Sequence, residues 1–152
     1  MPETGAGAKP AAGRAGVLST AGGPAEHGVA LGFDYGTRRI GVAIGNTVSA
    51  AARPLCVIAA GETRTWDTIA ALIDQWQPSV LVVGVARYSD GKPHAMTARC
   101  NRFARQLQGR FGRAVVRVDE RYSSAVVGGA MARDDEAAAV ILQQWLDQGA
   151  HE

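Results

Sequence analysis

Three acidic residues lie at the beginning or end of an apolar segment that is expected to be a strand or a helix. Asp34 ends the apolar run at 29–34, Glu120 ends a second run at 114–120, and Asp134 opens a helical pattern near the C-terminus. Carboxylate oxygens are the ligands that Mg²⁺ and Mn²⁺ prefer, and both ions keep open positions for water and phosphate oxygens. If the three carboxylates converge, one ion activates water and a second stabilises the leaving oxygen of a phosphodiester.

Such a cluster is costly unless positive charge lies within it. Two unit charges about 4 Å apart repel each other by about 4 kcal/mol at an effective dielectric of 20, so a bare cluster raises the pKa of at least one carboxyl group. Each acid also has a simpler explanation. Asp34 opens a turn, Asp119 and Glu120 mark a strand leaving the core, and Asp134 favours the positive end of a helix. Taken singly these explanations are preferred, whereas the joint placement favours a metal site.

The hydrophobic pattern indicates which elements would position these acids. Short apolar or β-branched runs predict strands, and apolar residues spaced three and four apart predict helices. The predicted strands are 29–34, 39–45, 53–59, 79–86 and 114–120. The predicted helices carry three inward stripes: Trp66, Ile69, Ile73 and Trp76; Met96, Cys100, Phe103 and Leu107; and Ala138, Ile141, Leu142 and Trp145.

This order of elements predicts an α/β fold. The first three strands form an antiparallel meander, and the two later strands, reached through crossover helices, join in parallel, which gives a mixed five-stranded sheet flanked by helices. Ligands collect beyond the carboxyl ends of parallel strands, so Asp34 and Glu120 are expected at one edge of the sheet. Asp134 falls on the inward stripe of the last helix, so we expect the three carboxylates to converge.

Composition and cysteine usage limit the class of protein. With 47% hydrophobic and 20% charged residues the chain is typical of a soluble globular protein. Cys56 and Cys100 show no Cys-x-x-Cys spacing, which favours a reduced, cytoplasmic setting. No run is long enough to cross a bilayer and no signal peptide is evident, so we expect no membrane association. The Gly-, Ala- and Pro-rich segment 1–28 is expected to be a disordered tail before one domain at 29–152.

Positive charge is concentrated in one part of the chain. The whole chain has a formal charge of +2, but the block 85–121 holds nine bases against the three acids Asp90, Asp119 and Glu120. The bases are Arg87, Lys92, Arg99, Arg102, Arg105, Arg110, Arg113, Arg117 and Arg121. Such a block is expected where one face meets a polyanion, although a solvated Arg-rich helix explains it equally well.

Four motifs in this order resemble a known family. LGFDYGTRRIGVAIG, LVVGVARYSDGKPHAMTARCNRFARQLQGRFG, VDERYSS and DEAAAVILQQWLDQ closely resemble the YqgF/RuvX family of pre-16S rRNA nucleases, which are similar to Holliday junction resolvases. The resemblance covers residues 29–148 and implies an RNase H-like fold. It also implies that Asp34, Glu120 and Asp134 are catalytic and bind one or two Mg²⁺ or Mn²⁺ ions.

The resemblance and the basic block together predict the contacts to nucleic acid. Thr37 and Arg38 match the turn of the first motif, and residues 121, 123 and 124 match positions beside the metal site. The predicted nucleic-acid contacts are Thr37, Arg38, Arg87, Lys92, Arg99, Arg102, Arg121, Ser123 and Ser124.

The chain departs from the family pattern in two places. GVARYSDG stands where the family usually has G-L-P-x-x-x-x-G, which puts Arg87 at the mouth of the expected site. Residues 125–133 form a segment about a dozen residues shorter than is common in the family. Because that segment is expected to shape substrate entry, its shortening bears on substrate choice and on activity.

The expected function is metal-dependent endonuclease activity in 5′-end maturation of pre-16S rRNA. Alternatives are a Holliday junction resolvase in DNA recombination or repair and a catalytically silent RNA-binding maturation factor. An ATPase is ranked last, because actin-like folds with a D-x-G-T turn need two such lobes and a longer chain. The sequence leaves open the choice between structured RNA and branched DNA, and between a monomer and a homodimer.

Overall fold

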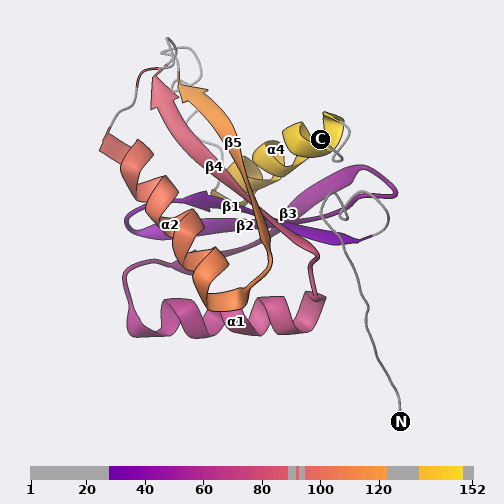
Figure 1. The fold of residues 1–152 in the computed structure, drawn as a ribbon, viewed down its shortest axis with the longest axis horizontal. Helices are drawn as coiled ribbons and strands as arrows, with labels where there is room; N and C mark the ends of the chain where they lie inside the picture. The colour runs from indigo at the N-terminus through magenta and orange to yellow at the C-terminus, as the bar shows by residue number, and fades with distance from the viewer. Residues whose placement is uncertain (1–27, 89–91, 93–94, 123–133, 149–152) are drawn as a thin grey trace.

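The computed structural model describes residues 28–88, 92, 95–122 and 134–148 (Figure 1). These residues form five strands and three helices in the predicted order. The elements are β1 (Val29–Tyr35), β2 (Arg39–Asn46), β3 (Ala51–Ala59), α1 (Thr63–Trp76), β4 (Val80–Tyr88), α2 (Ala95–Phe111), β5 (Ala114–Tyr122) and α4 (Asp134–Asp147).

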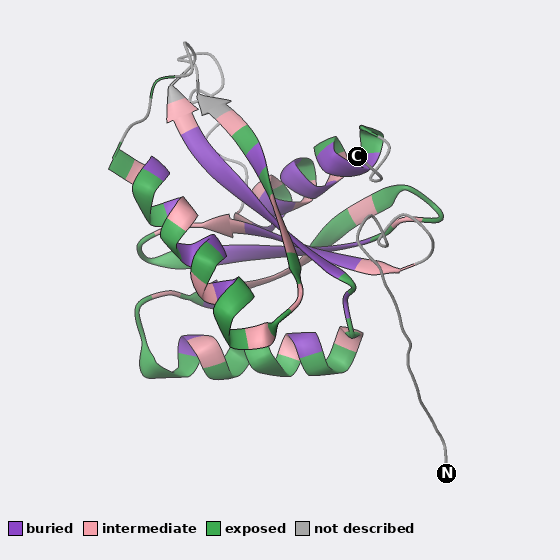
Figure 2. Cartoon of the chain, viewed as in Figure 1, coloured by how far each residue is buried: buried purple, intermediate pink, exposed green. Residues whose placement is uncertain are grey.

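The strands form one sheet with the order β3-β2-β1-β4-β5. β1, β2 and β3 pair antiparallel, while β4 pairs parallel with β1 and with β5. The predicted mixed sheet is therefore confirmed. Every residue of β4 from Val80 to Ala86 is buried, in agreement with the uninterrupted apolar run that predicted a strand covered on both faces (Figure 2).

Helices cover both faces of the sheet (Figure 1). α1 and α2 share one core with the side chains of Leu31, Phe33 and Leu81, and α4 shares a second core with the alternate positions Ala30, Val80 and Val82. Neighbouring residues of a strand thus contribute to different cores, as the alternation of side chains along a strand requires. The predicted inward residues that the structure buries are Ile69, Ile73, Cys100, Phe103, Leu107, Ala138, Ile141, Leu142 and Trp145.

The N-terminus of α4 lies directly against the backbone of β2. A Cβ atom at Gly41 would overlap with the carbonyl carbon and oxygen of Asp134. Gly41 is the register partner of Asp34 in the β1–β2 ladder, so the first residue of α4 lies beside the end of β1. The close approach that glycine permits at position 41 therefore determines where Asp134 lies.

Only Gly28 of the predicted tail 1–28 is among the described residues. Its backbone N–H donates to Oγ1 of Thr47 at 2.9 Å, and its carbonyl accepts from the backbone N–H of Thr47 at 3.0 Å. The ordered domain thus includes residue 28, and the disorder of the preceding residues stays a prediction. Within the described ranges, no helix combines the length and the apolar character that crossing a bilayer demands.

Two glycine substitutions test the contact between α4 and β2. Gly41→Ala is expected to lower the free energy of unfolding by about 1–3 kcal/mol, because the added methyl group must displace α4. Gly109→Ala is the control: nothing lies within 4 Å of a Cβ at this position in α2, so it is expected to raise stability by about 0.5–1 kcal/mol. Urea unfolding followed by circular dichroism measures both changes. Equal stability of the two variants would contradict the close contact.

Candidate active site

Asp34 lies at the end of β1 on the face that α4 covers. Gly32, two residues earlier, packs against Leu142 of α4, and alternate residues of a strand share a face. Burial, and to a smaller extent the negative charge of Asp134, raises the pKa of the Asp34 carboxyl group from 3.8 to about 6. The site therefore holds a carboxyl group whose ionised form is poorly stabilised by its surroundings.

The side chain of Glu120 extends from β5 toward Asp34 and passes over Gly84 of β4, which has no side chain. A Cβ at Gly84 would lie 3.2 Å from Oε1 of Glu120, so the carboxyl group lies over β4 where glycine leaves room. Gly84 directly follows Val83, the register partner of Phe33, and so stands next to Asp34 across the β1–β4 pair. Burial, followed by the charge of Asp34, raises the pKa of Glu120 from 4.5 to about 7.

Asp134 is the first residue of α4 and already has a cationic partner. Nε of Arg39 lies 2.6 Å from Oδ2 of Asp134, and both side chains are partly exposed. Arg39 is two residues before Gly41 on β2 and so lies on the face that α4 covers. Sequence reasoning selected Arg38 and missed Arg39. Arg39 is two residues from Gly41, and strand alternation could have placed the two on the same face of the sheet.

The structure brings the three predicted carboxylates to one end of the sheet, with Asp34 electrostatically coupled to both of the others. Within the described part of the chain, however, no three His, Cys, Asp or Glu side chains are close enough together to form a ready ligand group for one ion. The donor chemistry nevertheless fits Mg²⁺, because this ion is usually held by one or two carboxylates and keeps several waters. The rise in pKa is also of the kind that a bound cation reverses.

The predicted nucleic-acid contacts fall into several groups. Thr37, Arg38 and Lys92 are exposed, and so are Arg99 and Arg102 on α2. Arg121 belongs to β5 by its backbone, whereas 123, 124 and the shortened segment 125–133 lie outside the described residues.

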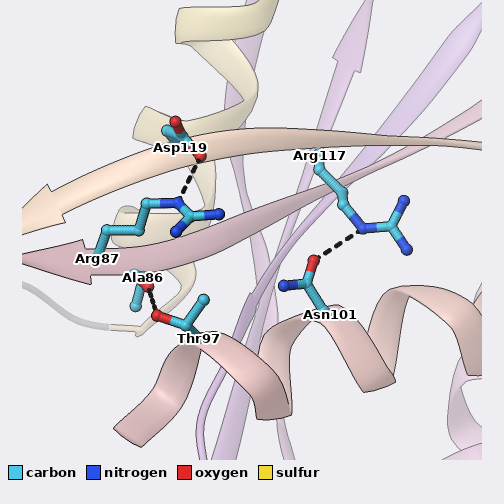
Figure 3. A network of polar contacts seen from close by, with 6 residues as sticks. All are labelled: Ala86, Arg87, Thr97, Asn101, Arg117 and Asp119. Atoms are coloured by element: carbon cyan, nitrogen blue, oxygen red, sulfur yellow. Dashed lines mark hydrogen bonds and ion pairs between the residues drawn. The ribbon is translucent and has the colours of Figure 1, made fainter. Parts of the chain in front are cut away.

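Arg87 lies elsewhere than at the expected mouth of the site. Its Nε donates to Oδ1 of Asp119 at 3.1 Å (Figure 3). Val85, two residues before Arg87 and paired with Asp119, packs with Cys100 of α2. Arg87 and Asp119 therefore lie on the α2 face, opposite Glu120, because neighbouring strand positions alternate between faces.

Other arginines of the basic block have structural contacts. Arg117 donates from Nε to Oδ1 of Asn101 at 3.0 Å and so joins β5 to α2 (Figure 3). Arg113 donates to the carbonyl oxygen of Pro78 at 2.6 Å, and Cζ of Arg110 lies 4.3 Å from the ring centroid of Trp66. The block is thus partly structural, and its solvent-facing charge is concentrated on α2.

The sheet and its helices have an RNase H-like fold. The structure is similar to RuvC of Thermus thermophilus in complex with a Holliday junction substrate, with a TM-score of 0.52 and 14% sequence identity over 82% of this chain and 98% of that chain. The chain belongs to the RuvX family, described as Holliday junction resolvase, whose family model matches residues 28–148.

Two relatives carry a more specific name. A protein of Polynucleobacter necessarius named "Putative pre-16S rRNA nuclease" is 49% identical over 124 residues, which cover 78% of this chain and 84% of the relative. A Burkholderia ambifaria protein of the same name is 49% identical over 131 residues, which cover 78% of this chain and 88% of the relative.

The raised pKa values predict how stability depends on pH without divalent ions. Asp34 and Glu120 have higher pKa values in the folded protein than in the unfolded chain, so the folded protein binds their protons more tightly. The free energy of unfolding is therefore expected to fall as pH rises from about 4 through the folded pKa values of about 6 for Asp34 and about 7 for Glu120. Above pH 7, ionisation of Asp34 is expected to have lowered the free energy of unfolding by on the order of 3 kcal/mol, relative to its value near pH 4. Urea unfolding in EDTA at pH 5 and pH 8 measures it.

Two comparisons isolate the contribution of the site. Asp34→Asn is expected to show a smaller difference between pH 5 and pH 8, because one of the two titrating groups is gone. Mg²⁺ is expected to stabilise the unaltered protein more at pH 8 than at pH 5, because protons compete with the ion. Equal stabilisation at both pH values would contradict binding of the ion by these carboxylates.

Proposed function

We propose that this RuvX-family protein is a divalent-metal-dependent endonuclease that matures the 5′ end of pre-16S rRNA. The observation that carries the proposal is the arrangement of Asp34, Glu120 and Asp134 at one end of the sheet, where Gly41 and Gly84 leave room for them. The name shared by the two relatives supports pre-16S rRNA as the substrate.

Each of the three acids has a distinct part in the proposed reaction. Asp34 and Glu120 are partly buried, so their carboxylate oxygens are less well solvated than those of surface acids and are suited to bind a hard cation. Asp134, which is paired with Arg39 in this structure, would be the third residue available to hold the ion. A bound divalent ion supplies a water of lowered pKa and neutralises charge on the phosphate. Arg39 is exposed to solvent beside Asp134 and would be available to contact the phosphodiester.

Among the described residues, the predicted contacts to nucleic acid are mainly cationic side chains. Thr37 and Arg38 project from the β1–β2 turn, and Arg99 and Arg102 from α2, all of them exposed. Phosphate contacts of this kind fix the position of a nucleic acid but carry no sequence information. Binding is therefore expected to depend on the shape of the RNA and to weaken steeply with salt.

A four-way DNA junction is the second candidate substrate. The description of the family and the likeness to RuvC bound to a Holliday junction favour it. A resolvase that cuts symmetrically needs two sites, so it acts as a dimer. A monomer that cleaves precursor rRNA and leaves junctions intact would favour the rRNA role.

Substitution of single carboxylates tests the catalytic assignment. Asp34→Asn and Glu120→Gln are each expected to lower the cleavage rate by at least about 10²-fold with either Mg²⁺ or Mn²⁺, the loss typical of a group that stabilises transition-state charge. The substrates are a precursor rRNA 5′ fragment and a synthetic four-way junction, and gel electrophoresis of the products measures the rates.

Asp119→Asn is the matched control. Asp119 is adjacent to Glu120 but points to the other face, where it makes an exposed ion pair with Arg87 that contributes about 1 kcal/mol or less. This variant is expected to keep most of the activity. Undiminished cleavage by Asp34→Asn would refute the catalytic site, and salt-sensitive RNA binding by the unaltered protein without cleavage under any divalent ion would identify a silent maturation factor.

A further inference from the structure

A second concave site lies on the face of the sheet opposite α4. The N-terminus of α1, the middle of α2 and the β1–β2 hairpin enclose a pocket of about 220 Å³, here called the α1–α2 pocket. The residues that line it and matter for its chemistry are Tyr35, Glu62, Trp66, Arg99, Arg102 and Phe103. No step of the proposed cleavage reaction uses this pocket.

One wall of the α1–α2 pocket is aromatic. The ring centroid of Phe103 lies 4.9 Å from that of Tyr35 and 5.6 Å from that of Trp66, and Phe103 is buried while the other two rings are partly exposed. Arg110 packs over the ring of Trp66. These contacts hold the rings in place, so the wall is preorganised to receive a flat apolar group such as a nucleobase.

The backbone beside this wall is fixed as well. The hydroxyl of Thr65 donates to the carbonyl oxygen of Ala59 at 2.7 Å and accepts the backbone N–H of Glu62 at 3.2 Å. The start of α1 is thereby joined to the end of β3. A preformed pocket loses little conformational entropy when a ligand enters it.

The rim of the pocket is cationic. Arg99 and Arg102 are exposed and lie one turn apart on α2, so their guanidinium groups project from neighbouring positions. Within the described residues neither makes a salt bridge or side-chain hydrogen bond, in contrast to Arg113 and Arg117. Glu62 is the one carboxylate among the lining residues, so positive charge exceeds negative charge at the pocket.

The pocket and the acidic site adjoin the same end of β1. Asp34 and Tyr35 are consecutive, with Cα atoms about 3.8 Å apart, and their side chains point to opposite faces of the sheet. A nucleic-acid strand that passes over this edge therefore reaches both sites within a few nucleotides. The pocket is too small for a base pair, which favours an unpaired base.

We propose that the α1–α2 pocket is a nucleotide subsite that holds an unpaired base of the RNA substrate against Tyr35 and Trp66, with the adjoining phosphate bound by Arg99 and Arg102. The proposal rests on the nucleic-acid function proposed above and adds a preference for a single-stranded segment next to the cleaved bond. Stacking on aromatic rings tolerates any base, so this preference concerns strandedness and not sequence.

Binding measured in EDTA tests the subsite without cleavage. Fluorescence anisotropy compares a short single-stranded RNA with a blunt RNA duplex of the same length. Tyr35→Leu, which keeps an apolar contact to Phe103, is expected to weaken single-strand binding about 5- to 100-fold. Arg102→Gln is expected to weaken it at least about 5-fold and to lower the salt slope by about 1, with a smaller effect on the duplex.

Arg105→Gln is the matched control, because Arg105 is exposed on the same helix but does not line the pocket. It is expected to affect both probes alike, by about twofold or less. Equal effects of Arg102→Gln and Arg105→Gln on the single strand would overturn the subsite. Uridine monophosphate carries one base and one phosphate, so it is expected to compete weakly with the single-stranded RNA, and Tyr35→Leu is expected to weaken this competition as well. Competition that Tyr35→Leu leaves unchanged would overturn the subsite.

Photocrosslinking of the unaltered protein provides a readout that does not depend on the folding of any variant. A single-stranded RNA carrying 5-iodouridine is expected to crosslink to the peptide that contains Tyr35 or Trp66. Crosslinks confined to other peptides would overturn the proposal. If the crosslink forms but no RNA is cleaved, the subsite stands and the nuclease proposal fails; if cleavage depends on Asp34 but no such crosslink forms, the reverse holds.

Discussion

Direct contact between the backbone of α4 and that of the sheet is the constraint on which the acidic site depends. Gly41 has no side chain to separate β2 from Asp134, and Gly84 leaves the space that the Glu120 carboxyl group enters. Helices usually pack on sheets through a layer of side chains, which would hold Asp134 several ångströms further out. Two glycines therefore do as much to define the site as the acids themselves.

The two faces of the sheet carry different functional groups: acids on the α4 face, and arginines with aromatic rings on the α1–α2 face. On the α4 face, burial raises the pKa values of Asp34 and Glu120, and the charges of Asp134 and Asp34, respectively, raise them further, so this face attracts cations. On the α1–α2 face, Arg99 and Arg102 attract phosphate beside an aromatic wall. Because side chains alternate along β1, the two faces meet at consecutive residues. One strand end thus adjoins both the proposed metal site and the proposed nucleotide subsite, and their opposite charges lie on opposite faces of the sheet.

Much of this arrangement follows from the sequence, because hydrophobic periodicity specifies elements without reference to their neighbours. The order of strands and helices, the mixed sheet and the inward residues of α2 and α4 were all predictable. The meeting of Asp34 and Glu120 at one end followed from the rule for parallel strands, and the position of Asp134 followed from the inward stripe of the last helix. Their failure to form a ready three-ligand group did not, because it depends on side-chain positions that only packing determines.

Charged side chains were the least predictable part of the site. Arg87 was expected at its mouth, but β4 continues through Tyr88 and the alternation of the strand carries Arg87 to the other face. Arg39 became recognisable as the partner of Asp134 only once α4 was placed on β2. Likewise, composition alone cannot separate Arg117, bound to Asn101, from the solvent-facing Arg102, because the difference lies in contacts between β5 and α2.

The ion pair between Arg39 and Asp134 has a consequence for the order of events during the life of the protein. With a guanidinium beside one acid, and with raised pKa values that reduce the negative charge of the other two, the chain offsets part of the repulsion at its acidic end. It can therefore reach its native shape in a compartment where free divalent ions are scarce, unlike small domains that stay unfolded until a metal arrives. Under the proposed function, folding of the scaffold and binding of the ion are then separate steps.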